Sequence, residues 1–186
     1  MQRLAATLCL SGAFLFALGN AGSAQQVDSE ELRGGHENPP VISDGTGDFT
    51  AQIDIDRIPF QLTYDAGSEG SAPDQAHLHI ANLGNNGGIV VFLCSNLGNT
   101  PVGATVRECP PSPGQVVGDI VAGDVLPVVD GEPPTATPII GAGDLEGLKL
   151  LIDQGAVYAN VHTPAHATGE IRAQLLSQSL LPARRR

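Results

Sequence analysis

Short stretches in which apolar and polar residues alternate recur along this chain, and they constrain its fold more than any other feature. A period of two is typical of a β-strand with one buried and one solvated face. The alternation is clearest in residues 48–55 and 58–64, which predict a hairpin. It returns in residues 76–81, 156–162 and 169–175, each bounded by turn-forming residues.

The remaining segments complete an all-β architecture. Residues 88–94 are apolar on both faces, which predicts a central strand. Residues 115–129 predict one further strand, followed by a loop rich in proline and glycine. Leucines at helical spacing after a capping Asp144 predict one short helix near 144–153. We therefore expect an antiparallel β sandwich or barrel of roughly seven or eight strands with one short helix.

The alternation in the last strand also predicts which side chains are buried. Three apolar residues at every second position are expected to face the core. The polar residues between them are expected to face solvent. The inward set is Ile171, Ala173 and Leu175, and the outward set is Glu170, Arg172 and Gln174.

The first 24 residues have the pattern of a secretory signal peptide. Arg3 precedes an apolar run over residues 8–18, and the small residues Gly22, Ser23 and Ala24 follow. The run is shorter than a membrane span requires, although a buried helix over the same residues is an alternative. We expect a secreted or periplasmic protein with no membrane span after cleavage.

The boundaries that follow divide the rest of the chain into three parts. Polar residues 25–34 are expected to form a flexible leader, and residues 35–176 the β domain. Residues 177–186, which end in three arginines, are expected to form a C-terminal tail.

The charge of the chain excludes one class of partner. Twenty acidic residues against nine basic ones give a formal net charge of −11. Nucleic acids and anionic lipids are bound through clustered lysine and arginine. We therefore expect no nucleic-acid partner, and a protein or small ligand of unknown identity instead.

The three cysteines fit an exported protein. Cys9 would leave with the signal peptide, so that Cys94 and Cys109 remain as an even pair in an oxidising compartment. A disulfide between them would close a loop of about 15 residues and stabilise the fold by ~3 kcal/mol. A pair of metal-binding thiolates is the alternative.

Several segments together resemble the CHRD domain, the module first described in chordin. The opening pattern of that family is matched by residues 34–40 (GGHENPP), and its Ala-His-Leu-His strand by residues 76–80. Its apolar strand after an Asn-Gly turn is matched by residues 86–93, and its closing patterns by residues 158–163 and 169–172. The resemblance implies an immunoglobulin-like barrel similar in outline to copper-zinc superoxide dismutase. It implies no settled activity.

Four of the five histidines fall in two clusters, which makes them candidate metal ligands. His77 and His79 are two residues apart on a strand, so both leave the same face. His162 ends a later strand and His166 follows in a loop. If the two strands pair, these imidazoles converge, and imidazole suits copper and zinc. Protons would compete with such an ion as the pH falls through ~6.5.

Two further expectations surround these histidines. Carboxylates in the same blocks could complete a metal site. They are Glu37, Asp74 and Glu170. The alternative is that the histidines are structural and form hydrogen bonds that hold the strands together.

No catalytic residue is identified. The chain lacks a Gly-x-Ser-x-Gly motif, and its cysteines are explained by a disulfide. We therefore expect an exported, non-catalytic binding or structural module. A copper or zinc binding protein is the first alternative. An oxidoreductase of the superoxide dismutase type is the second, although the full ligand set of that enzyme is not found here.

Overall fold

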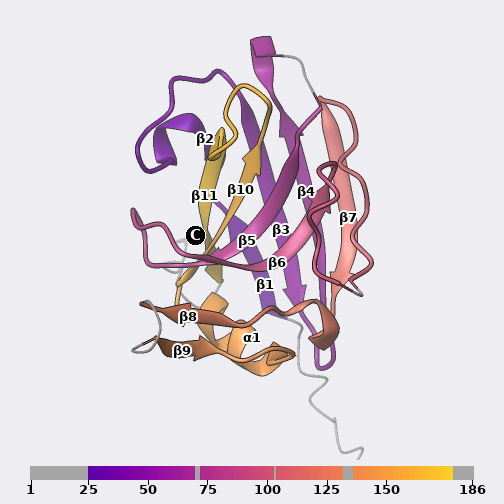
Figure 1. Cartoon of the computed structure of the whole chain (residues 1–186), viewed down its shortest axis with the longest axis vertical. Coiled ribbons are helices and arrows are strands. Elements are labelled where there is room, and N and C mark those ends of the chain that lie inside the picture. Colours follow the sequence, from indigo (N-terminus) through magenta and orange to yellow (C-terminus); the bar gives the residue numbers. More distant parts are fainter. Residues whose placement is uncertain (1–24, 70–71, 103, 132–135, 178–186) are drawn as a thin grey trace, which may run out of the picture.

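The computed structural model describes residues 25–69, 72–102, 104–131 and 136–177. Within these residues the chain is an antiparallel β sandwich with one short helix, as predicted (Figure 1). The predicted signal peptide, residues 1–24, lies outside the described residues, as does all of the predicted tail after Ser177.

Nine strands of the described chain form one antiparallel sheet. Its order is β6-β5-β10-β11-β1-β3-β4-β7, and β2 pairs with both β11 and β3. The strands are β1 (Gln25–Ser29), β2 (Leu32–Arg33), β3 (Thr46–Ile53), β4 (Ile58–Asp65), β5 (Gln75–Ile80), β6 (Gly88–Ser95), β7 (Gly114–Ile120), β10 (Val157–His162) and β11 (Ile171–Ser177).

A smaller hairpin and four helical segments complete the fold. The hairpin consists of β8 (Val128–Asp130) and β9 (Thr137–Ile140), which pair only with each other among the described strands. The helical segments are η1 (Gly34–His36), η2 (Gly67–Glu69), η3 (Ala122–Asp124) and α1 (Leu145–Asp153). Figure 1 shows α1 beside the β8–β9 hairpin at one end of the sandwich.

The sheet folds over so that its two halves enclose one apolar core. Figure 1 shows β5 and β6 crossing in front of β3 and β4. Fully buried residues from both halves, such as Leu62 of β4 and Leu78 of β5, belong to one cluster. The predicted β3–β4 hairpin is confirmed, and its inward rings of Phe49 and Phe60 stack with centroids 5.9 Å apart.

The predicted helix is confirmed together with its cap. The Asp144 side chain accepts a hydrogen bond from the backbone N–H of Gly147 at 2.8 Å. This bond satisfies one of the amide groups left free at a helix N-terminus. Leu148 and Ile152 are buried, so the apolar face of α1 closes one end of the core.

The leader expected over residues 25–34 is instead part of the sheet. β1 pairs with both β11 and β3, and β2 also joins these two strands. The side chains of Val27 and Leu32 are fully buried. The segment looks polar because most of its side chains face outward, while two apolar residues are enough to anchor it.

The expectation of a central strand over residues 88–94 is wrong. β6 ends the strand order and pairs only with β5 in the described sheet. Its other edge receives irregular backbone, because the N–H of Leu126 donates to the carbonyl of Val90 at 2.8 Å. Val128 packs against Gly88. Residues 126–128 thus lie along the edge of β6 at which a central strand would have a second neighbouring strand.

The expectation of one strand over residues 115–129 is also wrong. β7 ends at Ile120, and η3 then separates it from β8. Gly123 and Pro127 lie in this break, which is consistent with their poor fit to a continuous strand.

The polar face of β11 does not face solvent, contrary to expectation. Glu170, Arg172 and Gln174 are only 1%, 2% and 8% exposed. Residues 34–40 and the loop 82–87 cover this face. The two covering segments are tied together, because Asn38 donates to the Gly84 carbonyl and Asn86 donates to the Asn38 carbonyl. A layer of buried polar side chains therefore lies outside the apolar core.

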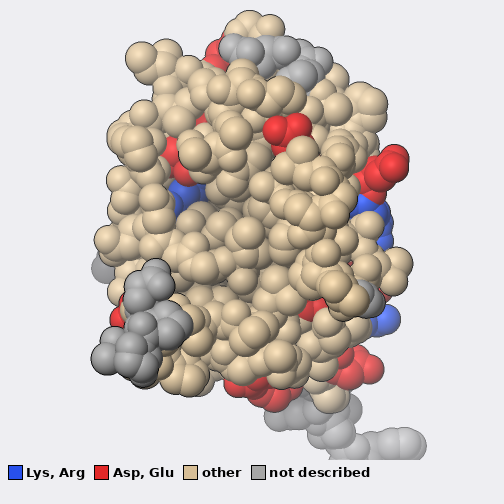
Figure 2. All heavy atoms as spheres, viewed as in Figure 1, with Lys and Arg blue, Asp and Glu red and all other residues tan. Residues whose placement is uncertain are grey.

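Acidic side chains are visible at several places on the surface. On the face in Figure 2 they gather along the lower edge, and basic atoms show at few places. This distribution agrees with the formal net charge of −11.

Candidate metal centre

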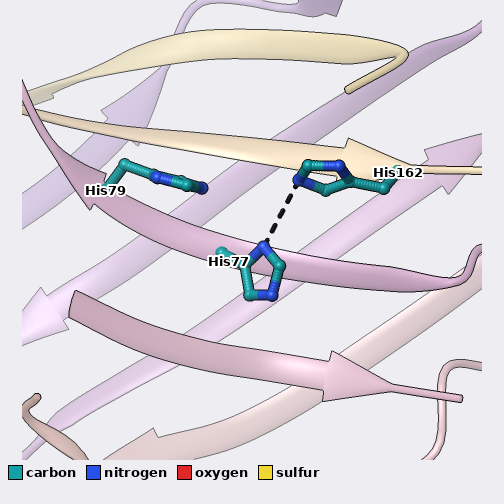
Figure 3. A group of neighbouring side chains, drawn as sticks. All are labelled: His77, His79 and His162. Atoms are coloured by element: carbon teal, nitrogen blue, oxygen red, sulfur yellow. Dashed lines mark hydrogen bonds between the residues drawn. The ribbon is translucent and has the colours of Figure 1, made fainter. Parts of the chain in front are cut away.

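Two neighbouring strands place three histidines on the buried polar face. β5 and β10 pair so that His77 lies opposite Asn160 and His79 lies opposite Tyr158. His162 is two residues beyond Asn160, so its side chain leaves the same face as those of His77 and His79. Figure 3 shows the three rings converging on the space between the two strands.

The nitrogen atoms of this histidine cluster lie close together. His77 Nδ1 is 3.3 Å from His162 Nε2, and one nitrogen from each of the three rings lies within 4.8 Å of the others. Two nitrogens bound at ~2.0–2.1 Å to a tetrahedral zinc ion are roughly 3.3–3.4 Å apart. The separation of the His77 and His162 nitrogens therefore matches that of two ligands of one ion. In the metal-free protein a hydrogen bond joins them, in which His77 Nδ1 donates to His162 Nε2, and an ion would replace this proton.

Backbone carbonyls orient two of the rings. His79 Nδ1 donates to the Gly87 carbonyl at 2.9 Å, and His162 Nδ1 donates to the Ala167 carbonyl at 3.0 Å. Because a carbonyl only accepts, Nδ1 carries the proton in both rings and Nε2 keeps its lone pair. Histidine ligands of metals are commonly held in this way.

Burial keeps the three imidazoles neutral at physiological pH. Desolvation, reinforced by the neighbouring histidines, lowers the pKa of His77 to about 3. Desolvation likewise lowers the pKa of His79 to about 4 and lowers the pKa of His162. Since a metal ion binds only the neutral ring, these side chains are in the protonation state that coordination needs.

The hydrogen bonds within the cluster leave lone pairs without a partner. The Nε2 atoms of His77 and His79 are buried and accept no hydrogen bond from described residues. Most buried polar atoms in proteins do have a partner. A purely structural role explains the three Nδ1 hydrogen bonds, but it leaves the lone pair of His79 Nε2 without a donor.

Aromatic and cationic groups enclose the cluster. The Tyr158 ring stacks on the His79 ring with centroids 4.8 Å apart, and the Arg172 guanidinium lies 3.4 Å from the centre of the Tyr158 ring. The Phe92 ring meets His77 edge-on at 4.5 Å. These contacts limit the rotation of His77 and His79, which are 0% and 8% exposed.

The structure does not bring the other candidate ligands into the cluster. His166 is only half-buried, and its backbone forms the turn with Thr163 rather than the site. The three-histidine group contains none of the expected carboxylates. Asp74 lies beside it, because its backbone N–H donates to the His162 carbonyl at 2.8 Å and its charge partly offsets the lowering of the His162 pKa. Glu37 packs against Gly169, and Glu170 accepts a hydrogen bond from Ser43 at 2.7 Å.

Sequence reasoning missed Tyr158, Asn160 and Arg172 as neighbours of the histidines. Tyr158 and Asn160 share the period-two face of His162, so the alternation in β10 contained the signal. Arg172 is opposite Asn160 in the β10–β11 register. Its burial could not be read from the strand, because it depends on the distant segments that cover it.

The disulfide predicted from the two remaining cysteines is confirmed. Cys94 at the end of β6 is bonded to Cys109, and both are buried. The bond ties the loop after β6 to the sheet. Disulfides of this kind are typical of proteins from oxidising compartments.

Fold and site together define a class of protein. The chain is a disulfide-bonded antiparallel β sandwich that carries a buried histidine cluster on the polar face of its sheet. The family model of the CHRD domain matches residues 29–175, and the chain belongs to the CHRD domain family. Searches of curated proteins and of solved structures found no significant match. Among the described residues, no helix is long and apolar enough to cross a membrane.

Proposed function

We propose that this protein is an exported, non-catalytic CHRD module that binds one copper or zinc ion through His77, His79 and His162. The observation that carries the proposal is the convergence of three buried, neutral imidazoles within 4.8 Å of one another. Export is supported by the signal-like pattern in residues 1–24 and by the disulfide.

The donor set favours these two metals over harder cations. Copper and zinc bind imidazole well, whereas calcium and magnesium prefer oxygen ligands. The cluster offers three nitrogen ligands, of which His79 and His162 would coordinate through Nε2. A fourth position would be filled from outside the cluster.

The test is metal binding by the intact protein and by histidine variants. Isothermal titration with Zn²⁺ and Cu²⁺ should give about one ion per chain for the wild-type protein. His77→Ala and His162→Ala should each weaken binding at least tenfold, because each removes one ligand nitrogen. His166→Ala and His36→Ala serve as matched controls and should bind as tightly as wild type.

Burial changes the expected pH dependence of binding. An unperturbed imidazole would lose its metal as the pH falls through ~6.5. Because the pKa of His79 is about 4 and that of His77 about 3, protons should displace the ion only at a lower pH. Titration at pH values from about 7 to 4 should locate the loss well below ~6.5.

Two outcomes would contradict the proposal. Wild-type protein with no saturable binding of either ion would exclude the metal site. Superoxide dismutation by the copper-loaded protein, lost in His77→Ala, would instead support the oxidoreductase alternative and exclude a non-catalytic module.

A further inference from the structure

One more buried polar side chain belongs to the face of the sheet that carries the histidine cluster. Asn160 of β10 lies opposite His77 of β5 and two residues before His162. Side chains two residues apart on a strand leave the same face, so Asn160 and His162 share theirs. Asn160 is only 3% exposed. The strand pairing therefore places a buried amide group next to the clustered histidines.

The neighbours of Asn160 show which end of its amide faces the histidines. Burial raises the pKa of Glu37, and the Asn160 side chain opposes this rise, because an amide N–H stabilises a carboxylate. Burial lowers the pKa of His79, and Asn160 opposes this as well, because an amide oxygen stabilises a protonated ring. The nitrogen of Asn160 thus faces Glu37, and its oxygen faces His79. Since His79 Nδ1 donates to the Gly87 carbonyl, the ring atom left for this oxygen is Nε2.

Two acceptor atoms meet here without a proton between them. Asn160 Oδ1 and His79 Nε2 are both buried, and neither accepts a hydrogen bond from the described residues. His79 carries its proton on Nδ1, so neither atom can donate to the other. Facing acceptors of this kind are costly to bury unless a cation or a hydrogen-bond donor lies between them. A metal ion bound by the histidines would satisfy both atoms at once.

Building on the metal site proposed above, we propose that Asn160 Oδ1 is the fourth ligand of the ion bound by His77, His79 and His162. The centre then consists of three imidazole nitrogens and one amide oxygen, all of them neutral. The ion displaces the proton between His77 Nδ1 and His162 Nε2, and the His77 ring carries that proton on Nε2 instead. The Asn160 N–H stays directed at Glu37, which draws electron density toward the oxygen and strengthens it as a ligand.

Four protein ligands make this centre a closed one. Structural zinc sites are closed in this way, whereas catalytic sites keep one position for water or substrate. An added anion then finds no free position on the ion, which fits a non-catalytic module. Small anions that bind metals therefore report whether the fourth position is occupied.

Cobalt(II) in place of zinc, followed by visible absorption, tests the fourth ligand with azide as the probe anion. The spectrum of wild-type protein loaded with Co²⁺ should not change when azide is added. Asn160→Ala removes the ligand oxygen, so water should enter the fourth position and azide should displace it saturably. Isothermal titration should show that the same variant binds Zn²⁺ about tenfold more weakly than wild type.

Two further variants separate loss of a ligand from loss of packing. Asn160→Asp keeps an oxygen at this position, so azide should again be excluded and Zn²⁺ should bind at least as tightly as in wild type. Gln174→Ala is the matched control, because Gln174 is another buried amide with an unpaired oxygen. Its amide nitrogen donates to the Ala81 and Gly155 carbonyls and not to the cluster. Its loss should leave azide excluded and the affinity for Zn²⁺ unchanged.

The outcomes separate the fourth ligand from the metal site itself. Wild-type protein that binds no metal ion would exclude both. Saturable azide binding to the Co²⁺-loaded wild type would overturn the role of Asn160 alone. An Asn160→Ala variant that excludes azide and keeps wild-type affinity would do the same. Thermal unfolding of each variant is measured first, and if Asn160→Ala does not fold, azide titration of wild type and Asn160→Asp decides the outcome.

Discussion

Mild acid should destabilise the metal-free protein, because its buried histidines cannot take up a proton while the chain is folded. His77 and His79 have folded pKa values of about 3 and 4, lowered chiefly by desolvation, against 6.5 in an unfolded chain. Between these values the unfolded state binds more protons than the folded state. The free energy of unfolding therefore falls as the pH falls below about 6.5.

The size of this effect follows from the two pKa values. Between about pH 7 and pH 5, protonation of one unfolded histidine lowers the free energy of unfolding by about 2 kcal/mol. His77 and His79 together give about 4 kcal/mol, and the lowered pKa of His162 adds to the loss. Against a usual total stability of about 5–15 kcal/mol, this is a large fraction.

Glu37 acts in the opposite direction. Desolvation, opposed by the charge of Arg172, raises its pKa from 4.5 to about 7. The folded state therefore binds the extra proton, and Glu37 contributes stability that is present at low pH and lost as the pH rises through about 7. Over the same interval this offsets about 2 kcal/mol, so that a net loss of at least about 2 kcal/mol remains.

Urea unfolding in EDTA at about pH 7, 6 and 5 measures the loss directly. His77→Gln removes one titrating group, so its stability should fall by about 2 kcal/mol less than that of wild type over this interval. His166→Gln, outside the cluster, should keep the wild-type dependence. The reasoning is refuted if wild-type stability is the same at both ends of the range, or if His77→Gln leaves the slope unchanged.

Two further predictions concern the stability of the fold. Replacing Cys94 and Cys109 together by serine should lower the free energy of unfolding by about 3 kcal/mol in denaturant titrations, and wild-type protein unfolded without reductant should show no free thiol among these two residues. Gly169→Ala should cost about 1–3 kcal/mol, since Gly169 has a φ of +126° and an added Cβ would lie 2.5 Å from Glu37 Oε1. Gly35→Ala is the control, because nothing lies within 4 Å of the added Cβ. Equal melting temperatures for the two glycine variants would contradict this account.

The local sequence pattern predicted the helix and the strands better than it predicted which segments pack around them. The β3–β4 hairpin and α1 follow from alternation and from the cap at Asp144, which depend on neighbouring residues alone. The central position expected for β6 was wrong. Apolar residues on both faces of a strand indicate that both faces are buried, but they do not show which segment lies beside the strand. In this fold the irregular backbone around Leu126, and not another strand of the sheet, lies along the free edge of β6.

The same limit applies to the candidate site. Period two places His77 and His79 on one face, and the pairing of β5 with β10 brings His162 to them. The polar side of β11 was expected in solvent, since alternation does not reveal that residues 34–40 lie over Arg172 and Gln174. The burial of Arg172 and Gln174 could therefore not be predicted from the strand's own sequence.

The position of Tyr158 gives the protein a built-in optical probe. The chain has no tryptophan and only two tyrosines, so its near-ultraviolet absorption comes largely from Tyr64 and Tyr158. Tyr64 belongs to β4 and donates to the Pro110 carbonyl. In the strand order β4 is separated from β5 and β10, which carry the histidines. Tyr158 instead has an imidazole on one side and a guanidinium on the other. Its electronic environment changes when either neighbour does, which makes one phenol ring a spectroscopic reporter of the histidine cluster and of Arg172 without any attached label.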